Sequence, residues 1–230
     1  MSADVVIPVT MDTRTVVGIG GFPDEPLLEY VLELARGRRL LYVPTADGED
    51  RWSTVEWYER LHGRVEMTHT HFHPWPPEDL RELALGHDLI LVSGGNTANA
   101  LAIWRVHGFD RILREAWEAG VVLFGWSAGM ICWFEAGVTD SFGPELRGMQ
   151  DGLGFLPGSA CPHYDSEERR RPVYQSLVAG GFPAGLALDD GAAARFAGTE
   201  LVEVVASAPG AGGYRVGAEG EEPLGVRLLG

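Results

Sequence analysis

VVLFGWSAG, residues 121–129, joins a short apolar run to a Gly-x-Ser-x-Gly pattern. The apolar run is typical of a buried strand, and the small residues Gly125, Ala128 and Gly129 permit a sharp turn from that strand into a helix. Such a turn holds the Ser127 hydroxyl clear of the sheet, at a helix N-terminus where backbone N–H groups can stabilise negative charge. The pattern therefore makes Ser127 a candidate nucleophile.

Apolar runs and helical patterns alternate on both sides of this turn. Strands are predicted at residues 15–20, 40–43, 65–69, 88–92 and 121–124. Helices are predicted at residues 26–36, 53–61, 79–85, 97–106 and 109–117. This alternation implies right-handed crossovers, and therefore an α/β fold whose central, mostly parallel sheet is flanked by helices on both faces.

The pattern changes beyond about residue 150. A strand at residues 153–161 and a helix at 170–178 are expected first. Short strands are then expected at residues 185–188, 192–196, 201–206 and 225–229. The turns between them are rich in Gly, Ala and Asp, which favours antiparallel strands near the C-terminus. Since the chain shows no repeat, low-complexity tract or linker, we predict a single α/β domain over residues 1–230.

The composition limits the classes of partner. The chain has 230 residues, 45% of them hydrophobic, and a formal net charge of −15 from 33 acidic and 18 basic residues. Nucleic acid and anionic membranes bind basic faces, so neither is expected as a partner. Met1–Val5 lacks the basic and apolar regions of a signal peptide, which predicts a cytoplasmic protein. Two cysteines without metal-ligand spacing indicate neither a disulfide framework nor a structural zinc site.

A serine hydroxyl becomes a good nucleophile when a base removes its proton, and seven histidines are candidates for that base. His163 is favoured because it follows an apolar strand, within ACPHYD at residues 160–165. This position is the carboxyl end of a strand, where the functional residues of an open α/β sheet gather. The alternative is a loop histidine packed under Tyr164. His62 and His107 precede glycines at predicted helix ends, where a capping role is expected.

The base in turn needs a carboxylate that orients its ring. In the chain order Ser…Asp/Glu…His that accompanies this kind of turn, the carboxylate falls between Ser127 and His163. Asp140 is expected in this role because it lies on a turn that can return toward the site, and Glu145 is the alternative acid. Glu135 is set aside, since two turns of helix after the serine would carry it away.

An oxyanion hole needs backbone donors at fixed positions. The N–H of Ala128 is one candidate donor. A second is expected from Gly94 or Gly95, at the end of the predicted strand 88–92, because glycine lets the backbone approach a substrate closely. The alternative is an ordinary helix-entry turn with Asn96 or Thr97 as its N-cap.

His69, His71 and His73 share one face if the chain is extended there, which is compatible with a metal site. Three prolines follow within residues 74–77, so the segment is expected to leave the strand and no metal site is predicted.

Three motifs in order carry a family resemblance: LVSGGNT at residues 91–97, GWSAG at 125–129 and PHY at 162–164. Together they resemble peptidase E, the aspartyl dipeptidase of the S51 serine peptidases, a family that also includes the cyanophycinases. The resemblance extends from about residue 14 to residue 196. The chain is similar more distantly to the class I glutamine amidotransferases, which carry cysteine where this chain has Ser127.

The resemblance implies a Ser–His–acid peptidase that uses no metal or cofactor and acts on short peptides. The family roles fall on Ser127 as nucleophile and His163 as base, and Asp140 lies near the family's acidic position.

In peptidase E an arginine beyond the catalytic histidine recognises the N-terminal aspartate of the substrate. The resemblance gives that substrate-binding role to one of Arg169, Arg170 or Arg171, with a basic helix start on the surface as the alternative. Asn96 is also expected to contact the substrate.

The predicted function is a serine peptidase that hydrolyses short peptides through an acyl-enzyme. A cyanophycinase-like hydrolase of Asp–Arg peptides is the near alternative, since an acidic surface suits arginine side chains. A non-catalytic protein that binds a small peptide or amino acid is the alternative from a different class. The expected partner is a small peptide, and the prediction allows for a homodimer.

Overall fold

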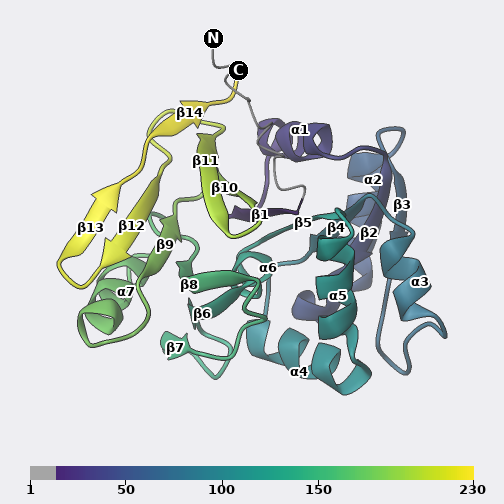
Figure 1. The fold of residues 1–230 in the computed structure, drawn as a ribbon, viewed down its shortest axis with the longest axis horizontal. Coiled ribbons are helices and arrows are strands. Elements are labelled where there is room, and N and C mark those ends of the chain that lie inside the picture. The colour runs from purple at the N-terminus through teal and green to yellow at the C-terminus, as the bar shows by residue number, and fades with distance from the viewer. Residues whose placement is uncertain (1–13) are drawn as a thin grey trace, which may run out of the picture.

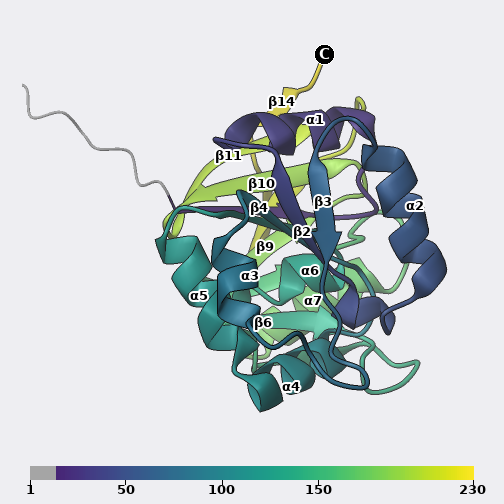
Figure 2. The ribbon, with the colours of Figure 1, turned by 90° about the vertical axis from the view of Figure 1, so that its right-hand side faces the viewer.

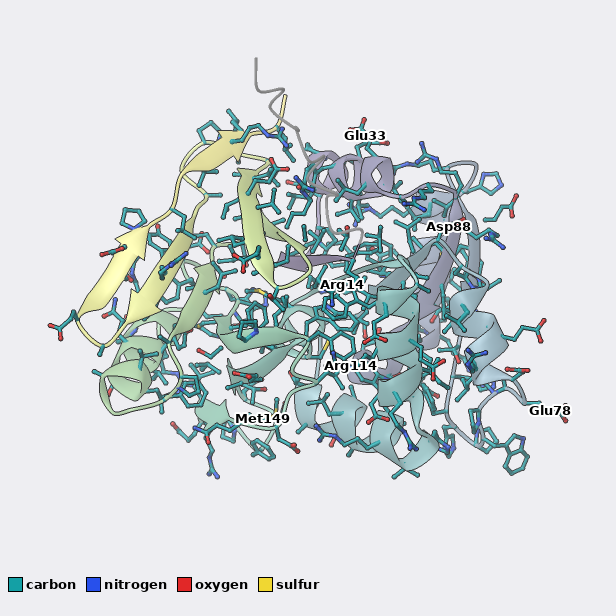
Figure 3. All side chains as sticks on the ribbon, in the orientation of Figure 1. Arg14, Glu33, Glu78, Asp88, Arg114 and Met149 are labelled. Atoms are coloured by element: carbon teal, nitrogen blue, oxygen red, sulfur yellow. The ribbon has the colours of Figure 1, made fainter. Side chains whose placement is uncertain are left out.

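The computed structural model describes residues 14–230, so Met1–Val5, on which the cytoplasmic prediction rests, lies outside the described residues. Within the described residues, no helix is long and apolar enough to cross a membrane. Acidic side chains such as those of Glu33 and Glu78 project from the periphery (Figure 3).

The larger of two sheets has eight strands and contains the parallel core that the sequence predicts. Its strand order is β14-β11-β10-β1-β5-β4-β2-β3. The five parallel strands are β1 (Thr15–Ile19), β2 (Arg39–Val43), β3 (Glu66–His69), β4 (Leu89–Val92) and β5 (Val122–Trp126). The sheet continues beyond β1 with β10 (Ala192–Ala197), β11 (Glu200–Ala206) and β14 (Val226–Leu228). Strand β10 is antiparallel to both β1 and β11, and β14 is parallel to β11.

Helices cover both faces of this sheet, because successive residues of its strands point to opposite sides. One face packs against α1 (Glu25–Leu34) and α2 (Arg51–Leu61). The other packs against α3 (Leu80–Leu85), α4 (Thr97–His107) and α5 (Phe109–Glu118). Figure 2 shows the two groups on opposite sides of β2, β3 and β4. On β4, for example, Leu89 and Leu91 join the first core and Ile90 and Val92 the second.

The second sheet has six strands in the order β13-β12-β9-β8-β6-β7 and lies beside the first (Figure 1). Its strands are β6 (Phe134–Thr139), β7 (Arg147–Met149), β8 (Leu156–Cys161), β9 (Gly185–Leu188), β12 (Gly213–Gly217) and β13 (Gly220–Pro223). Helix α7 (Arg170–Ala179) packs on one face through Tyr174 and Val178, which join a small core with Val138, Cys161 and Val216. The strands β6, β8 and β9 are mutually parallel, so their carboxyl ends lie along one edge.

The predicted α/β class is confirmed, but the region after Ser127 differs from the prediction. Helix α6 (Ala128–Ile131) has a single turn, and the chain continues as β6. Glu135 is therefore a strand residue and not part of a long helix. The strands after Ser127 are also more numerous than predicted, since four strands that were not expected, β6, β7, β12 and β13, join β8 and β9 in the second sheet. They are short and contain Gly, Glu or Pro, which weakens the apolar pattern that identifies a strand.

Candidate active site

Ser127 occupies the sharp turn between β5 and α6. Its backbone has φ 54° and ψ −111°, a conformation that residues with a side chain rarely adopt. The Ser127 carbonyl accepts hydrogen bonds from the amides of Met130 and Ile131, both at 3.0 Å, and the Ser127 amide donates to the Ile19 carbonyl at 3.1 Å. These bonds fix the turn and leave the hydroxyl without a capping role.

Glycines allow the turn to pack against the neighbouring strand. A Cβ atom on Gly129 would collide with the Val92 carbonyl oxygen at the end of β4, and one on Gly125 would lie 2.7 Å from that same oxygen. The Gly-x-Ser-x-Gly pattern is thus required by close backbone contact in this chain as well as by the turn.

Ser127 and His163 line one open pocket of about 510 Å³, together with Gly94 and Gly95. Ser127 follows β5, the glycines follow β4 and His163 follows β8, so all of them lie just beyond the carboxyl ends of strands. Among the described residues, no hydrogen bond joins the serine and histidine side chains directly. Catalytic hydrogen bonds are often long before substrate binds. The remaining lining residues are Phe22, Asp47, Asp50, Ser53 and Trp126.

The carboxylate that contacts His163 is Asp190, whose Oδ1 lies 2.7 Å from the imidazole Nδ1. A carboxylate accepts hydrogen bonds, so the proton of the neutral ring belongs on Nδ1 and the lone pair on Nε2. Asp190 follows β9, which pairs in parallel with β8. The two residues therefore meet because their strands end at the same edge.

The two predicted acids, Asp140 and Glu145, form no hydrogen bond with His163 within the described residues. Asp140 is exposed at the end of β6, and the turn that it begins packs against the start of α4 instead of returning to His163. Glu145 is also exposed and pairs with Arg169 at 3.4 Å. The chain order Ser…acid…His excludes Asp190, which follows the histidine. A polar residue soon after a short apolar strand is a signal that Asp190 shares with Asp140, so that signal alone does not choose between them.

The predicted oxyanion donors are the amides of Ala128, next to Ser127, and of Gly94 and Gly95, which line the pocket. Within residues 14–230, the amide nitrogens of Ala128, Gly94 and Gly95 form no hydrogen bond. Gly95 has φ +125°, and a Cβ atom on it would collide with the Ala46 carbonyl oxygen. Glycine at position 95 therefore allows the turn after β4 to pack closely against the backbone of Ala46.

Asn96 and the three arginines are occupied elsewhere. The Asn96 side chain caps α4 through the amide of Asn99 at 2.9 Å, and its Nδ2 donates to the Ser141 carbonyl at 3.0 Å. Arg170 is 4% exposed and bonds to Glu167 and the Val138 carbonyl.

Arg171 pairs with Glu221 and lies over the rings of Tyr164 and Tyr214. Arg169 bonds to the carbonyl of Pro144 in addition to Glu145. None of these arginines lines the pocket of Ser127.

Two aspartates supply negative charge to the pocket. Asp47 accepts hydrogen bonds from the Tyr42 and Ser53 hydroxyls at 3.0 and 2.9 Å and from the Asp50 amide at 3.2 Å. Burial raises the pKa of the Asp47 carboxyl, while the Ser53 hydroxyl opposes that shift. Asp50 caps α2 through the Ser53 amide at 2.8 Å and is exposed. Phe22 and Trp126 form an aromatic wall, with ring centroids 5.4 Å apart.

The three alternating histidines line a separate pocket at the end of β3. The Tyr58 hydroxyl lies 3.1 Å from Nδ1 of His69, whose pKa is lowered by burial and by the neighbouring His71. In the described part of the chain, no group of three or more potential metal ligands is found.

Comparisons with known proteins identify the family of the chain. The model of peptidase family S51 matches residues 17–204. An uncharacterized peptidase of Bacillus subtilis (strain 168), YgaJ, is 43% identical over 228 residues, covering 93% of this chain and 97% of the relative. A crystal structure of a peptidase from an acI-B1 Actinobacterium has the same fold, with a TM-score of 0.66, 19% identity and coverage of 92% and 94% of the two chains.

A crystal structure of a putative peptidase E from Listeria monocytogenes EGD-e also shares the fold. Its TM-score is 0.59 at 20% identity, with coverage of 82% of this chain and 96% of that chain. The chain belongs to peptidase family S51 and is a serine-type peptidase.

The backbone of Ser127 gives a stability prediction that is separate from chemistry. Glycine tolerates positive φ and alanine does not, so Ser127→Gly should be more stable than Ser127→Ala by about 1–2 kcal/mol. This difference is the backbone strain relieved in the folded state, reduced by the greater conformational entropy of glycine in the unfolded state. Urea unfolding of the two variants measures this difference. Ala128→Gly is the control, because Ala128 is helical and glycine should destabilise the fold there. Equal stabilities for the two Ser127 variants would contradict the strained turn.

Proposed function

We propose that this peptidase hydrolyses short peptides through a triad of Ser127, His163 and Asp190. The observation that carries the proposal is the shared pocket of Ser127 and His163, with the 2.7 Å contact from His163 Nδ1 to Asp190 behind it. A nucleophile, a base and a carboxylate that orients the base are the parts that acyl transfer requires.

In this mechanism the Ser127 Oγ attacks the peptide carbonyl carbon while His163 Nε2 takes its proton. Asp190 holds the ring in the tautomer that leaves Nε2 free, and it stabilises the imidazolium that forms. The carbon–nitrogen bond then breaks, and His163 donates the proton to the departing amine. Water then attacks the acyl carbonyl carbon while His163 Nε2 takes its proton. The bond from that carbon to the Ser127 Oγ breaks, and His163 returns the proton to the serine.

The oxyanion is assigned to the amides near the serine that form no hydrogen bond within residues 14–230. Ala128 donates from the first turn of α6, and Gly94 or Gly95 donates from the turn after β4. Donors that are fixed before the reaction stabilise the developing charge without reorganisation. Because Gly94 packs against the Trp126 indole, where a Cβ would lie 2.5 Å from Nε1, this turn is held in position by the pocket wall.

Triad variants test the assignment. Ser127→Ala should abolish hydrolysis of a dipeptide panel with the fold intact, and Asp190→Asn should lower kcat by roughly three to four orders of magnitude, because it removes the group that fixes the His163 tautomer. Steady-state hydrolysis, with product amine measured, gives both values.

The matched control is Asp140→Asn, which removes a carboxylate that is exposed and not in contact with His163. Its kcat should equal that of the wild type. Full activity in Ser127→Ala would end the proposed mechanism, whereas a large loss in Asp140→Asn with none in Asp190→Asn would restore the acid that the sequence suggested.

The charges of the pocket favour a substrate that carries a positive group. Asp47 and Asp50 line it, whereas the predicted arginine partners for an aspartate side chain do not. The aromatic faces of Phe22 and Trp126 add a surface on which an ammonium or guanidinium group can lie. These features support Asp–Arg peptides, and other peptides with an arginine or lysine, over Asp-X dipeptides in general.

Asp50→Asn tests this preference, since asparagine keeps the cap on α2 and removes the charge. The ratio of kcat/KM for Ala-Arg to that for Ala-Gln should fall by up to about fivefold, the range of an exposed ion pair. A wild-type enzyme that prefers Asp-Ala to Ala-Arg would contradict the inference from these charges.

A further inference from the structure

The loops that follow β8 and β9 are joined by a reciprocal pair of contacts. Going one way, His163 Nδ1 lies 2.7 Å from the Asp190 carboxylate. Going the other way, the Asp190 backbone amide donates to the Asp165 carboxylate oxygen Oδ1 at 2.8 Å. The Tyr164 amide also donates to the Leu188 carbonyl at 3.1 Å. One loop therefore offers a base and a carboxylate that together hold the side chain and the backbone of Asp190.

Gly21, just after β1, lies against the Asp190 carboxylate. A Cβ atom on Gly21 would lie 2.5 Å from the Asp190 Cγ and would also collide with Oδ1. The backbone of Gly21 is outside the left-handed region. Its glycine identity is therefore required by space and not by φ, and the space is the volume that the Asp190 carboxylate fills.

We propose that Asp165 and Gly21 are positioning residues for the Asp190–His163 pair. The proposal rests on the proposed function, because it assigns these residues to the triad. Asp165 fixes the backbone from which the Asp190 side chain extends. Gly21 leaves the room in which its carboxylate faces the imidazole. Neither residue lines the pocket, so neither is expected to touch the substrate.

Two features separate Asp165 from a residue that only supports the fold. It is exposed and outside the hydrophobic clusters, so its loss leaves the core intact. It also places a negative charge close to Asp189, a buried residue whose pKa is raised first by burial and then by Asp165. Like charges in close proximity oppose folding. The Asp165 carboxylate is therefore unfavourable for stability, but it accepts the hydrogen bond from the Asp190 amide, as a positioning role requires.

The test uses three variants and one control. Asp165→Ala removes the acceptor for the Asp190 amide, Asp165→Asn retains an acceptor oxygen without the charge, and Gly21→Ala fills the space of the carboxylate. The control is Gly37→Ala. A Cβ atom there would also lie 2.5 Å from a carboxylate carbon, that of Asp88, but at the amino-terminal end of the sheet (Figure 3 labels Asp88).

Two readouts follow the pair itself. The first is the downfield proton resonance of His163 Nδ1–H, assigned by its disappearance in His163→Gln. The second is the hydrolysis of p-nitrophenyl acetate, a small ester that needs the Ser127 nucleophile but no peptide subsite. Asp165→Ala and Gly21→Ala should shift the resonance upfield or abolish it. They should also lower kcat ten- to a hundredfold with little change in KM, the range expected when a reacting group is displaced by about an ångström.

Asp165→Asn should restore most of the activity and the resonance, and Gly37→Ala should match the wild type. Wild-type resonance and kcat in both Asp165→Ala and Gly21→Ala would overturn the proposal. Because Asp165 is exposed, Asp165→Ala decides the matter even if Gly21→Ala does not fold. The resonance does not depend on peptide hydrolysis, so failure of the proposed function, seen as activity in Ser127→Ala, is distinguishable from failure of this inference.

Discussion

The positive φ of Ser127 is the constraint on which the candidate site depends. To hold one residue with a side chain in that conformation, β5 must run directly into a one-turn helix, and Gly129 must lie against the Val92 carbonyl. The same turn leaves the Ala128 amide without a hydrogen-bond partner among residues 14–230. Local strain at a half-buried serine and an adjacent amide with no partner in the described chain therefore arise from a single backbone feature, and strained residues commonly cluster at functional sites.

Parallel pairing then brings distant segments to this turn. Strands β4 and β5 deliver Gly94 and Ser127 from one sheet, while β8 and β9 deliver His163 and Asp190 from the other. In the proposed mechanism the two sheets contribute different parts of the site: the nucleophile and the oxyanion donors come from the larger sheet, and the base with its carboxylate from the smaller. The charged and polar groups of the proposed reaction therefore meet where the two sheets adjoin.

Much of the fold and part of the site can be predicted from the sequence. Apolar runs bounded by glycines identify the parallel strands. A residue directly beyond a parallel strand lies at the carboxyl edge of its sheet, and this position alone predicts that Ser127 and His163 line one pocket. The partner of His163 cannot be found in that way, since Asp140 and Asp190 both follow strands that pair in parallel with β8. Only the tertiary contacts of the two turns distinguish them: the turn after Asp140 bonds to the start of α4, whereas the Asp190 carboxylate contacts His163. The ion pair of Arg171 with Glu221 likewise cannot be predicted from the sequence, because it depends on how the β12–β13 hairpin, far along the chain, packs in the fold.

The most direct measurement is covalent labelling of the intact protein with diisopropyl fluorophosphate, followed by peptide mass spectrometry. An activated hydroxyl beside His163 should carry one diisopropylphosphoryl group on Ser127 in the wild type, with the labelling rate greatly reduced in His163→Gln. An unmodified Ser127, or one that reacts equally fast without His163, would contradict the account and leave a peptide-binding protein as the better description.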